Sequence, residues 1–203
     1  MSARESLERL REGNRRFASG VRSLDLSQTG LREFVARQQP FAIILGCSDS
    51  RVPVEIVFDQ GLGDLFVVRV AGNVVAASQI GSVEFAAERF GTRLVVVLGH
   101  TRCGAVEATL EELRRPGASR SPNLRSIVDR IRPALEELSA AALGSDQEAL
   151  VRHAVRANVR ASASHLRQGS DILKRLIKEE GLLVVGAEYS LETGEVDFFD
   201  GVP

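Results

Sequence analysis

The chain has 203 residues, a length typical of one domain, and 44% of them are apolar, which excludes an intrinsically disordered protein. The 26 Lys and Arg nearly balance the 27 Asp and Glu, so a formal net charge of −1 leaves no basic surplus for nucleic acid or an acidic membrane. The apolar runs are far shorter than the ~18 residues that a membrane span needs. We therefore expect neither nucleic acid nor a membrane as a partner.

The first ten residues are charged throughout and lack the apolar stretch of a secretion signal. We therefore expect a cytoplasmic protein. In that compartment a structural disulfide between Cys47 and Cys103, the two cysteines of the chain, is disfavoured. Since the two thiols are then free, their positions in the sequence can indicate a functional site.

The N-terminal segment predicts an amphipathic helix. Ser6 is a candidate N-cap, and Leu7, Leu10 and Phe17 fall on one apolar face. This face can pack on the chain's own domain or on another subunit, and the pattern is compatible with both. A second, short helix is expected at 31–38.

From residue 41 onward, short apolar runs alternate with helical patterns. Apolar runs of this length indicate strands buried on both faces, and their alternation with helices predicts right-handed crossovers and a mainly parallel sheet. The expected parallel strands are 41–45, 65–70, 94–98 and 182–185, with a fifth, antiparallel edge strand at 195–199. Helices are expected at 53–60, at 78–90 and through 103–180, with breaks at 116–117, 122 and 144–145.

These elements define the fold class as α/β. The predicted architecture is a four-stranded, mainly parallel sheet with an added antiparallel edge strand, flanked by helices. We expect a single domain over 1–203, made of an N-terminal helical arm at 1–38 and an α/β core at 39–203.

Polar residues follow two of the predicted strands, at the sheet edge where α/β proteins bind ligands. Cys47 follows the first strand, and His100 and Cys103 follow the third. If these strands are neighbours, the three side chains converge on one point. Two thiolates and an imidazole suit tetrahedral zinc and leave its fourth position open.

Two further residues after the first strand extend this pattern. Asp49 can either occupy the fourth zinc position or stand beside it, and Arg51 has the planar guanidinium that pairs with a carboxylate through two hydrogen bonds. Zinc lowers the pKa of bound water to about 7 and supplies hydroxide at neutral pH. The set therefore fits metal-assisted hydration.

The Cys-x-Asp-x-Arg element at 47–51, followed by His-x-x-Cys at 100–103, closely resembles the β-class carbonic anhydrases. The resemblance covers about 38–107 and includes the segments 64–69, 71–73 and 81–86. It implies reversible hydration of carbon dioxide to bicarbonate and a proton by zinc-bound hydroxide. It also implies assembly into homodimers or dimers of dimers.

Within this resemblance, one zinc ion per chain is held by Cys47, His100 and Cys103. Asp49 and Arg51 match the catalytic dyad that orients the nucleophile, and Asp49 is a fourth zinc ligand in a closed state only. The substrate-binding positions map onto Gln38, which reaches the pocket across the dimer interface, and onto Phe66, Ala71, Phe85 and Gly104.

The sequence departs from the family at three positions. Phe85 stands where many relatives carry tyrosine, and Ala71 stands where some carry valine. Ile44 stands where a bicarbonate-regulated subgroup carries tryptophan, although Arg69 and Tyr189 match the other two residues of that regulatory site. We therefore do not expect bicarbonate regulation of that kind.

Two alternative functions remain open at this point. If Asp49 were a permanent fourth ligand, the protein would be an inert zinc module. A hydrolase of carbonyl sulfide or carbon disulfide would use the same chemistry as the hydrase. A thiol phosphatase is disfavoured, because three residues rather than five separate Cys47 from Arg51. His153 and His165 lie in Arg-rich helical sequence and are expected at the surface.

Overall fold

The computed structural model describes residues 1–21, 38–117, 121–136, 138 and 147–203. The helix expected at 31–38 lies outside these ranges except for Gln38, which is exposed and not helical. The break expected at 144–145 also lies outside them. None of the helices in the described ranges is long and apolar enough to cross a membrane.

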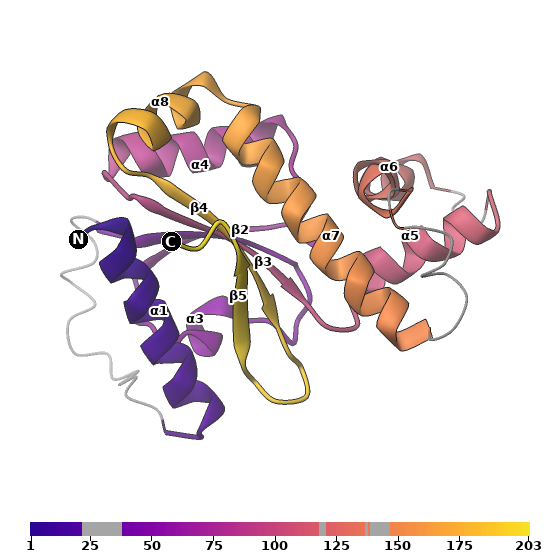
Figure 1. Cartoon of the computed structure of the whole chain (residues 1–203), viewed down its shortest axis with the longest axis horizontal. Helices are drawn as coiled ribbons and strands as arrows, with labels where there is room; N and C mark the ends of the chain where they lie inside the picture. Colours follow the sequence, from indigo (N-terminus) through magenta and orange to yellow (C-terminus); the bar gives the residue numbers. More distant parts are fainter. Residues whose placement is uncertain (22–37, 118–120, 137, 139–146) are drawn as a thin grey trace.

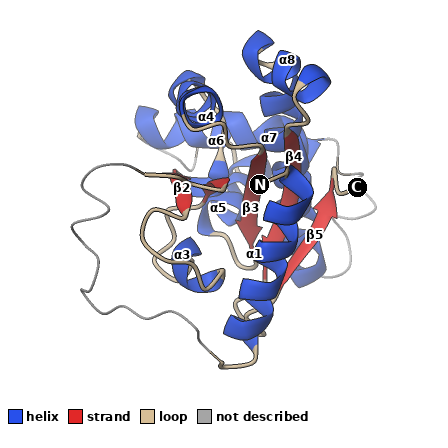
Figure 2. Cartoon of the chain, turned by 90° about the vertical axis from the view of Figure 1, so that its left-hand side faces the viewer, coloured by secondary structure: helices blue, strands red, loops and turns tan. Residues whose placement is uncertain are grey.

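Five strands form one sheet in the order β2-β1-β3-β4-β5 (Figures 1 and 2). The first four strands are parallel and the fifth is antiparallel to β4, which confirms the predicted architecture. The strands are β1 (Ala42–Gly46), β2 (Leu65–Arg69), β3 (Leu94–His100), β4 (Leu183–Tyr189) and β5 (Val196–Asp200).

Helices cover both faces of this sheet (Figure 1). They are α1 (Ala3–Ala18), α3 (Val54–Val57), α4 (Ala77–Arg89), α5 (Gly104–Arg114), α6 (Pro122–Glu136), α7 (Gln147–Gln168) and α8 (Asp171–Glu179), with a 3-10 turn, η1 (Ala71–Asn73). Because side chains alternate along a strand, Ile44 of β1 packs in one core cluster with residues of α1 and α3. Its neighbours Ile43 and Leu45 pack in a second cluster with residues of α4, α7 and α8.

A third apolar cluster lies at the carboxyl end of the sheet. It is built from α5, α6 and the N-terminal half of α7, and it includes Cys47 and Cys103. The chain passes from β1 to β2 on one side and later to β3 on the other, so the switch point of the topology lies between β1 and β3. Ligands of open α/β sheets bind at such a switch point.

The first helix begins four residues before the expected start, because Ser2 and not Ser6 is its N-cap. The Ser2 hydroxyl accepts a hydrogen bond from the Glu5 backbone N–H (3.3 Å), and the Glu5 carboxylate accepts one from the Ser2 backbone N–H (2.7 Å). Ser6 lies inside the helix and is buried. Leu7 and Leu10 pack in the core of their own chain, so this apolar face gives no reason for a second subunit.

Two other expectations need correction. Strand β2 is not buried on both faces: Phe66 to Val68 are half-buried, because β2 lies at the edge of the sheet and pairs with β1 alone among the described strands. In the long helical region, Pro122 begins α6 instead of interrupting a helix, as its missing N–H allows. The sequence analysis also missed the break before α8, where the Ser170 hydroxyl caps the backbone N–H of Leu173 at 3.0 Å.

Candidate metal centre

The structure brings Cys47, His100 and Cys103 together at the switch point. Gly46 of β1 pairs with Leu98 of β3, so Cys47 emerges beside the end of β3 that carries His100. Cys103 follows three residues later and precedes the first turn of α5. The ligand atoms of the three side chains all lie within 4.8 Å of one another, and all three residues are buried.

The imidazole of His100 is wholly buried, and its two nitrogens have different surroundings. Nδ1 lies 2.9 Å from the backbone carbonyl oxygen of Thr101, which can only accept, so Nδ1 carries the proton. In the neutral imidazole Nε2 then keeps its lone pair, and Nε2 has no hydrogen-bond partner among the described residues. A buried acceptor left unpaired costs about 1–3 kcal/mol. A bond from Nε2 to a metal ion would remove this cost.

The two thiols are unequal in acidity. The hydrogen bond from Cys103 lowers the pKa of Cys47, and the backbone N–H of Gly72, 3.3 Å from the Cys47 sulfur, adds to this effect. The same sulfur–sulfur contact, together with burial, raises the pKa of Cys103. Full ionisation of both thiols therefore requires a nearby positive charge. A divalent ion with a preference for sulfur and imidazole, such as zinc, fits this donor set.

Asp49 and Arg51 form a bidentate ion pair beside the three donors. The Arg51 Nε donates to Oδ1 at 2.9 Å and its Nη2 to Oδ2 at 2.7 Å, while the Arg51 backbone N–H also donates to Oδ1 at 2.9 Å. Oδ2 lies 3.9 Å from His100 Nε2. The hydrogen bonds from Arg51 hold the pKa of the Asp49 carboxyl well below its usual value. Asp49 is thus an ionised acceptor that stands beside the cluster.

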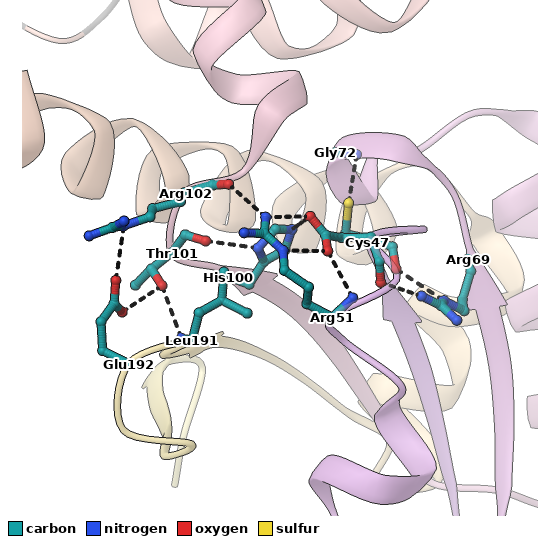
Figure 3. A network of polar contacts seen from close by, with 10 residues as sticks. Cys47, Arg51, Arg69, Gly72, His100, Thr101, Arg102, Leu191 and Glu192 are labelled. Atoms are coloured by element: carbon teal, nitrogen blue, oxygen red, sulfur yellow. Dashed lines mark hydrogen bonds and ion pairs between the residues drawn. The ribbon is translucent and has the colours of Figure 1, made fainter.

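Four residues that were not expected in the metal site hold its loops (Figure 3). Arg69, at the end of β2, donates to the carbonyls of Cys47 (3.1 Å) and Asp49 (2.7 Å). Glu192, in the turn between β4 and β5, accepts from the Thr101 hydroxyl (2.9 Å) and pairs with Arg102 (3.0 Å). The Thr101 carbonyl orients His100, and the Arg102 carbonyl accepts from Arg51 at 3.3 Å. The Arg102 side chain is exposed.

The predicted substrate residues fall into two groups. Ala71 belongs to η1, directly before Gly72, and Gly104 begins α5 directly after Cys103, so both lie next to the ligand residues. Phe66 pairs with Ile43, four residues before Cys47 on the neighbouring strand, which places it ~13 Å away along the strand direction.

Phe85 lies with Phe66 and not with the ligands. The two ring centroids are 6.2 Å apart, and Phe85 is 53% exposed. One chain therefore does not bring these phenylalanines to its own cluster. His153 and His165 are exposed on α7.

Comparisons with known proteins agree with this geometry. The carbonic anhydrase family model matches residues 42–196. Carbonic anhydrase 2 of Mycobacterium tuberculosis is 37% identical over 95% of this chain and 91% of its own length. The β-carbonic anhydrase CafA of Aspergillus fumigatus superposes with a TM-score of 0.77 at 27% identity, over 85% of this chain and 81% of that one.

A second solved structure shares the fold at lower identity. It comes from a pair of tetrameric β-carbonic anhydrases of Sordaria macrospora, with a TM-score of 0.75 at 21% identity over 83% of this chain and 85% of that one. The chain belongs to the β-class carbonic anhydrases. Reversible hydration of carbon dioxide is the general activity of that family.

The ion pair generates a prediction about acidity. Replacement Arg51→Ala removes the two side-chain hydrogen bonds that lower the pKa of Asp49 most, and it leaves the backbone N–H of residue 51 and the burial that raises this pKa, so the pKa should move upward. In the wild type, the lowered pKa of Asp49 keeps the ion pair intact from neutral pH down to below 3.8. The ion pair is lost only as the pH falls through the pKa that Asp49 has in the folded protein. Side-chain carboxyl ¹³C NMR of the zinc-free protein measures this shift.

The matched control for this measurement is Arg102→Ala. Its side chain pairs with Glu192 and not with Asp49. It should leave the Asp49 titration in place. An Asp49 pKa that is the same in wild type and Arg51→Ala would contradict the assigned pairing.

Proposed function

We propose that this chain hydrates carbon dioxide reversibly, using one zinc ion held by Cys47, His100 and Cys103. The observation that carries the proposal is the set of three buried donor atoms within 4.8 Å of one another, beside an ionised carboxylate. When bound there, zinc would lower the pKa of a water molecule and so supply hydroxide near neutral pH. Both cysteines are free, which suits a reducing compartment such as the cytoplasm.

Asp49 would orient the attacking oxygen. Its ionised carboxylate can only accept hydrogen bonds, so it selects the O–H that faces it and directs the free lone pair toward carbon. Arg51 keeps this carboxylate ionised and fixed through two side-chain hydrogen bonds. Thr101 fixes the tautomer of His100 from the other side. Ala71 has a small side chain and Gly104 has none, and both lie next to residues of the metal site. This suits a small uncharged substrate beside the metal.

Zinc loading tests the ligand set. The wild type should retain about one zinc per chain after dialysis against a chelator and hydrate carbon dioxide in a stopped-flow assay, whereas Cys103→Ser and His100→Ala should lose both zinc and activity. His165→Ala removes an exposed imidazole on α7 and serves as the control that keeps both. Full zinc retention with full activity in Cys103→Ser would exclude this assignment, and a zinc-loaded wild type without hydration activity would exclude the reaction.

We further propose that Asp49 becomes a fourth zinc ligand only when Arg51 releases it. The support is that Arg51 engages both carboxylate oxygens while Oδ2 lies 3.9 Å from His100 Nε2. Arg51→Ala should therefore close the site and weaken azide binding to the cobalt-substituted protein, followed by its visible spectrum. Asp49→Ala should retain zinc and bind azide at least as tightly as wild type. Equal azide affinity in Arg51→Ala and wild type would reject the closed state.

We also propose that the chain functions as a homodimer or a dimer of dimers, in which Gln38, Phe66 and Phe85 serve the pocket of a second copy. Phe66 lies ~13 Å along the strand direction from the ligands of its own chain, Phe85 packs beside it and is 53% exposed, and Gln38 is exposed. Phe66 belongs to β2, the half-buried edge strand of the sheet. The tetrameric assembly stated for the Sordaria proteins is in line with this proposal.

Subunit mixing tests this proposal directly. His100→Ala lacks a ligand, and Phe85→Ala lacks a pocket side chain, so each should be weakly active alone. A mixed dimer places the intact Phe85 of one chain at the intact metal site of the other. Exchange of equal amounts should therefore restore about a quarter of the wild-type sites. If the mixture, after its subunits have exchanged, shows only the sum of the activities that the two variants have separately, the shared pocket is contradicted. Ile177→Ala, an exposed apolar residue of α8, is the neutral control.

A further inference from the structure

The 3-10 turn η1 provides a hydrogen bond to one of the ligand sulfurs. The backbone N–H of Gly72 points at the Cys47 Sγ, 3.3 Å away (Figure 3). Both residues are buried. An N–H group fixed at this distance stabilises negative charge on the sulfur and fixes the direction from which a metal ion can approach it.

This turn has an uncommon backbone conformation. Gly72 has φ +67° and Asn73 has φ +44°, so two successive residues occupy the left-handed region, one of them with a side chain. A Cβ on residue 72 would lie 2.8 Å from the Ile131 side chain and 2.9 Å from that of Ala105. The Asn73 Nδ2 is buried and has no hydrogen-bond partner among the described residues, so this nitrogen adds no hydrogen bond to the turn.

Helix α7 supplies the contacts that hold the turn. The Asn158 Nδ2 donates to the Gly72 carbonyl at 2.8 Å, and the Ser162 hydroxyl donates to the Asn73 carbonyl at 3.0 Å. The two donors are four residues apart on one helix face, and both are buried. They therefore satisfy two consecutive carbonyls of η1, which would otherwise be buried without partners.

We propose that Asn158 and Ser162 are positioning residues for the metal centre. By holding the carbonyls of η1 they keep the Gly72 N–H directed at the Cys47 sulfur, so that α7 acts on the ligand through the backbone of the turn. This inference deepens the proposed function and rests on the zinc site proposed there. Mutation of an outer-shell partner of a metal ligand typically weakens metal binding about 10- to 100-fold. We expect a loss of zinc affinity in this range when Asn158 is replaced.

The experiment uses the full-length Asn158→Leu variant, which keeps the approximate volume of the side chain and removes the donor. Competition with a chromophoric chelator should show zinc bound at least ~10-fold more weakly than by wild type. The cobalt-substituted variant should show a shifted sulfur-to-metal charge-transfer band, because the N–H···S hydrogen bond is weakened. Ser162→Ala, a smaller change, should alter both quantities in the same direction and serves if Asn158→Leu does not fold.

Asn14→Leu is the matched control. Asn14 is also a buried asparagine whose Nδ2 donates to backbone carbonyls, those of Val57 and Gly194, but it lies on α1. It should lower the melting temperature while leaving zinc affinity and the cobalt spectrum as in wild type. Asn158→Leu and Ser162→Ala that match Asn14→Leu in both measurements would overturn the positioning role. A wild type that binds no zinc would instead overturn the proposed function, and this inference with it.

Discussion

The parallel pairing of β1 with β3 is the constraint on which the site depends. It places Cys47 beside the end of the strand that carries His100, at the point where the topology switches direction. A one-residue slip in this register would turn every side chain of β1 to the opposite layer and separate the sulfur from the imidazole. The register is fixed because Ile44 and its neighbours Ile43 and Leu45 belong to two different buried clusters, so a slip would disrupt both cores at once.

Backbone groups hold two of the three ligand side chains of the cluster. The Thr101 carbonyl fixes the His100 ring, and the Gly72 N–H contacts the Cys47 sulfur. These groups are anchored in turn by the β4–β5 turn through Glu192 and by α7 through Asn158. The arrangement leaves the Nε2 lone pair of His100 and two sulfurs of unequal acidity facing one another. A divalent cation satisfies all three, which is why the geometry fits a metal centre better than a cluster of core thiols.

The sequence predicted the sheet and the ligand cluster because both depend on short-range signals. Apolar runs mark the strands, and Cys47 and His100 follow two of them directly. The N-cap was misplaced although a local signal marks it: Glu5 stands three residues after Ser2 and completes a capping box, whereas Arg9 stands at that spacing after Ser6. Glu192 and Asn158 were missed for a different reason: they reach the site across 91 and 86 residues of sequence, and neither belongs to a local motif. The location of Phe66 depends on strand register, which no pattern within the strand reveals.

X-ray absorption at the zinc edge of the stoichiometrically loaded wild-type protein identifies the ligand atoms of the metal directly. We expect two sulfur scatterers at about 2.3 Å and two nitrogen or oxygen scatterers at about 2.0–2.2 Å, one of them with the multiple-scattering signature of an imidazole. A spectrum with fewer than two sulfur ligands, or without the imidazole signature, would contradict the assignment of Cys47, His100 and Cys103 as the metal ligands.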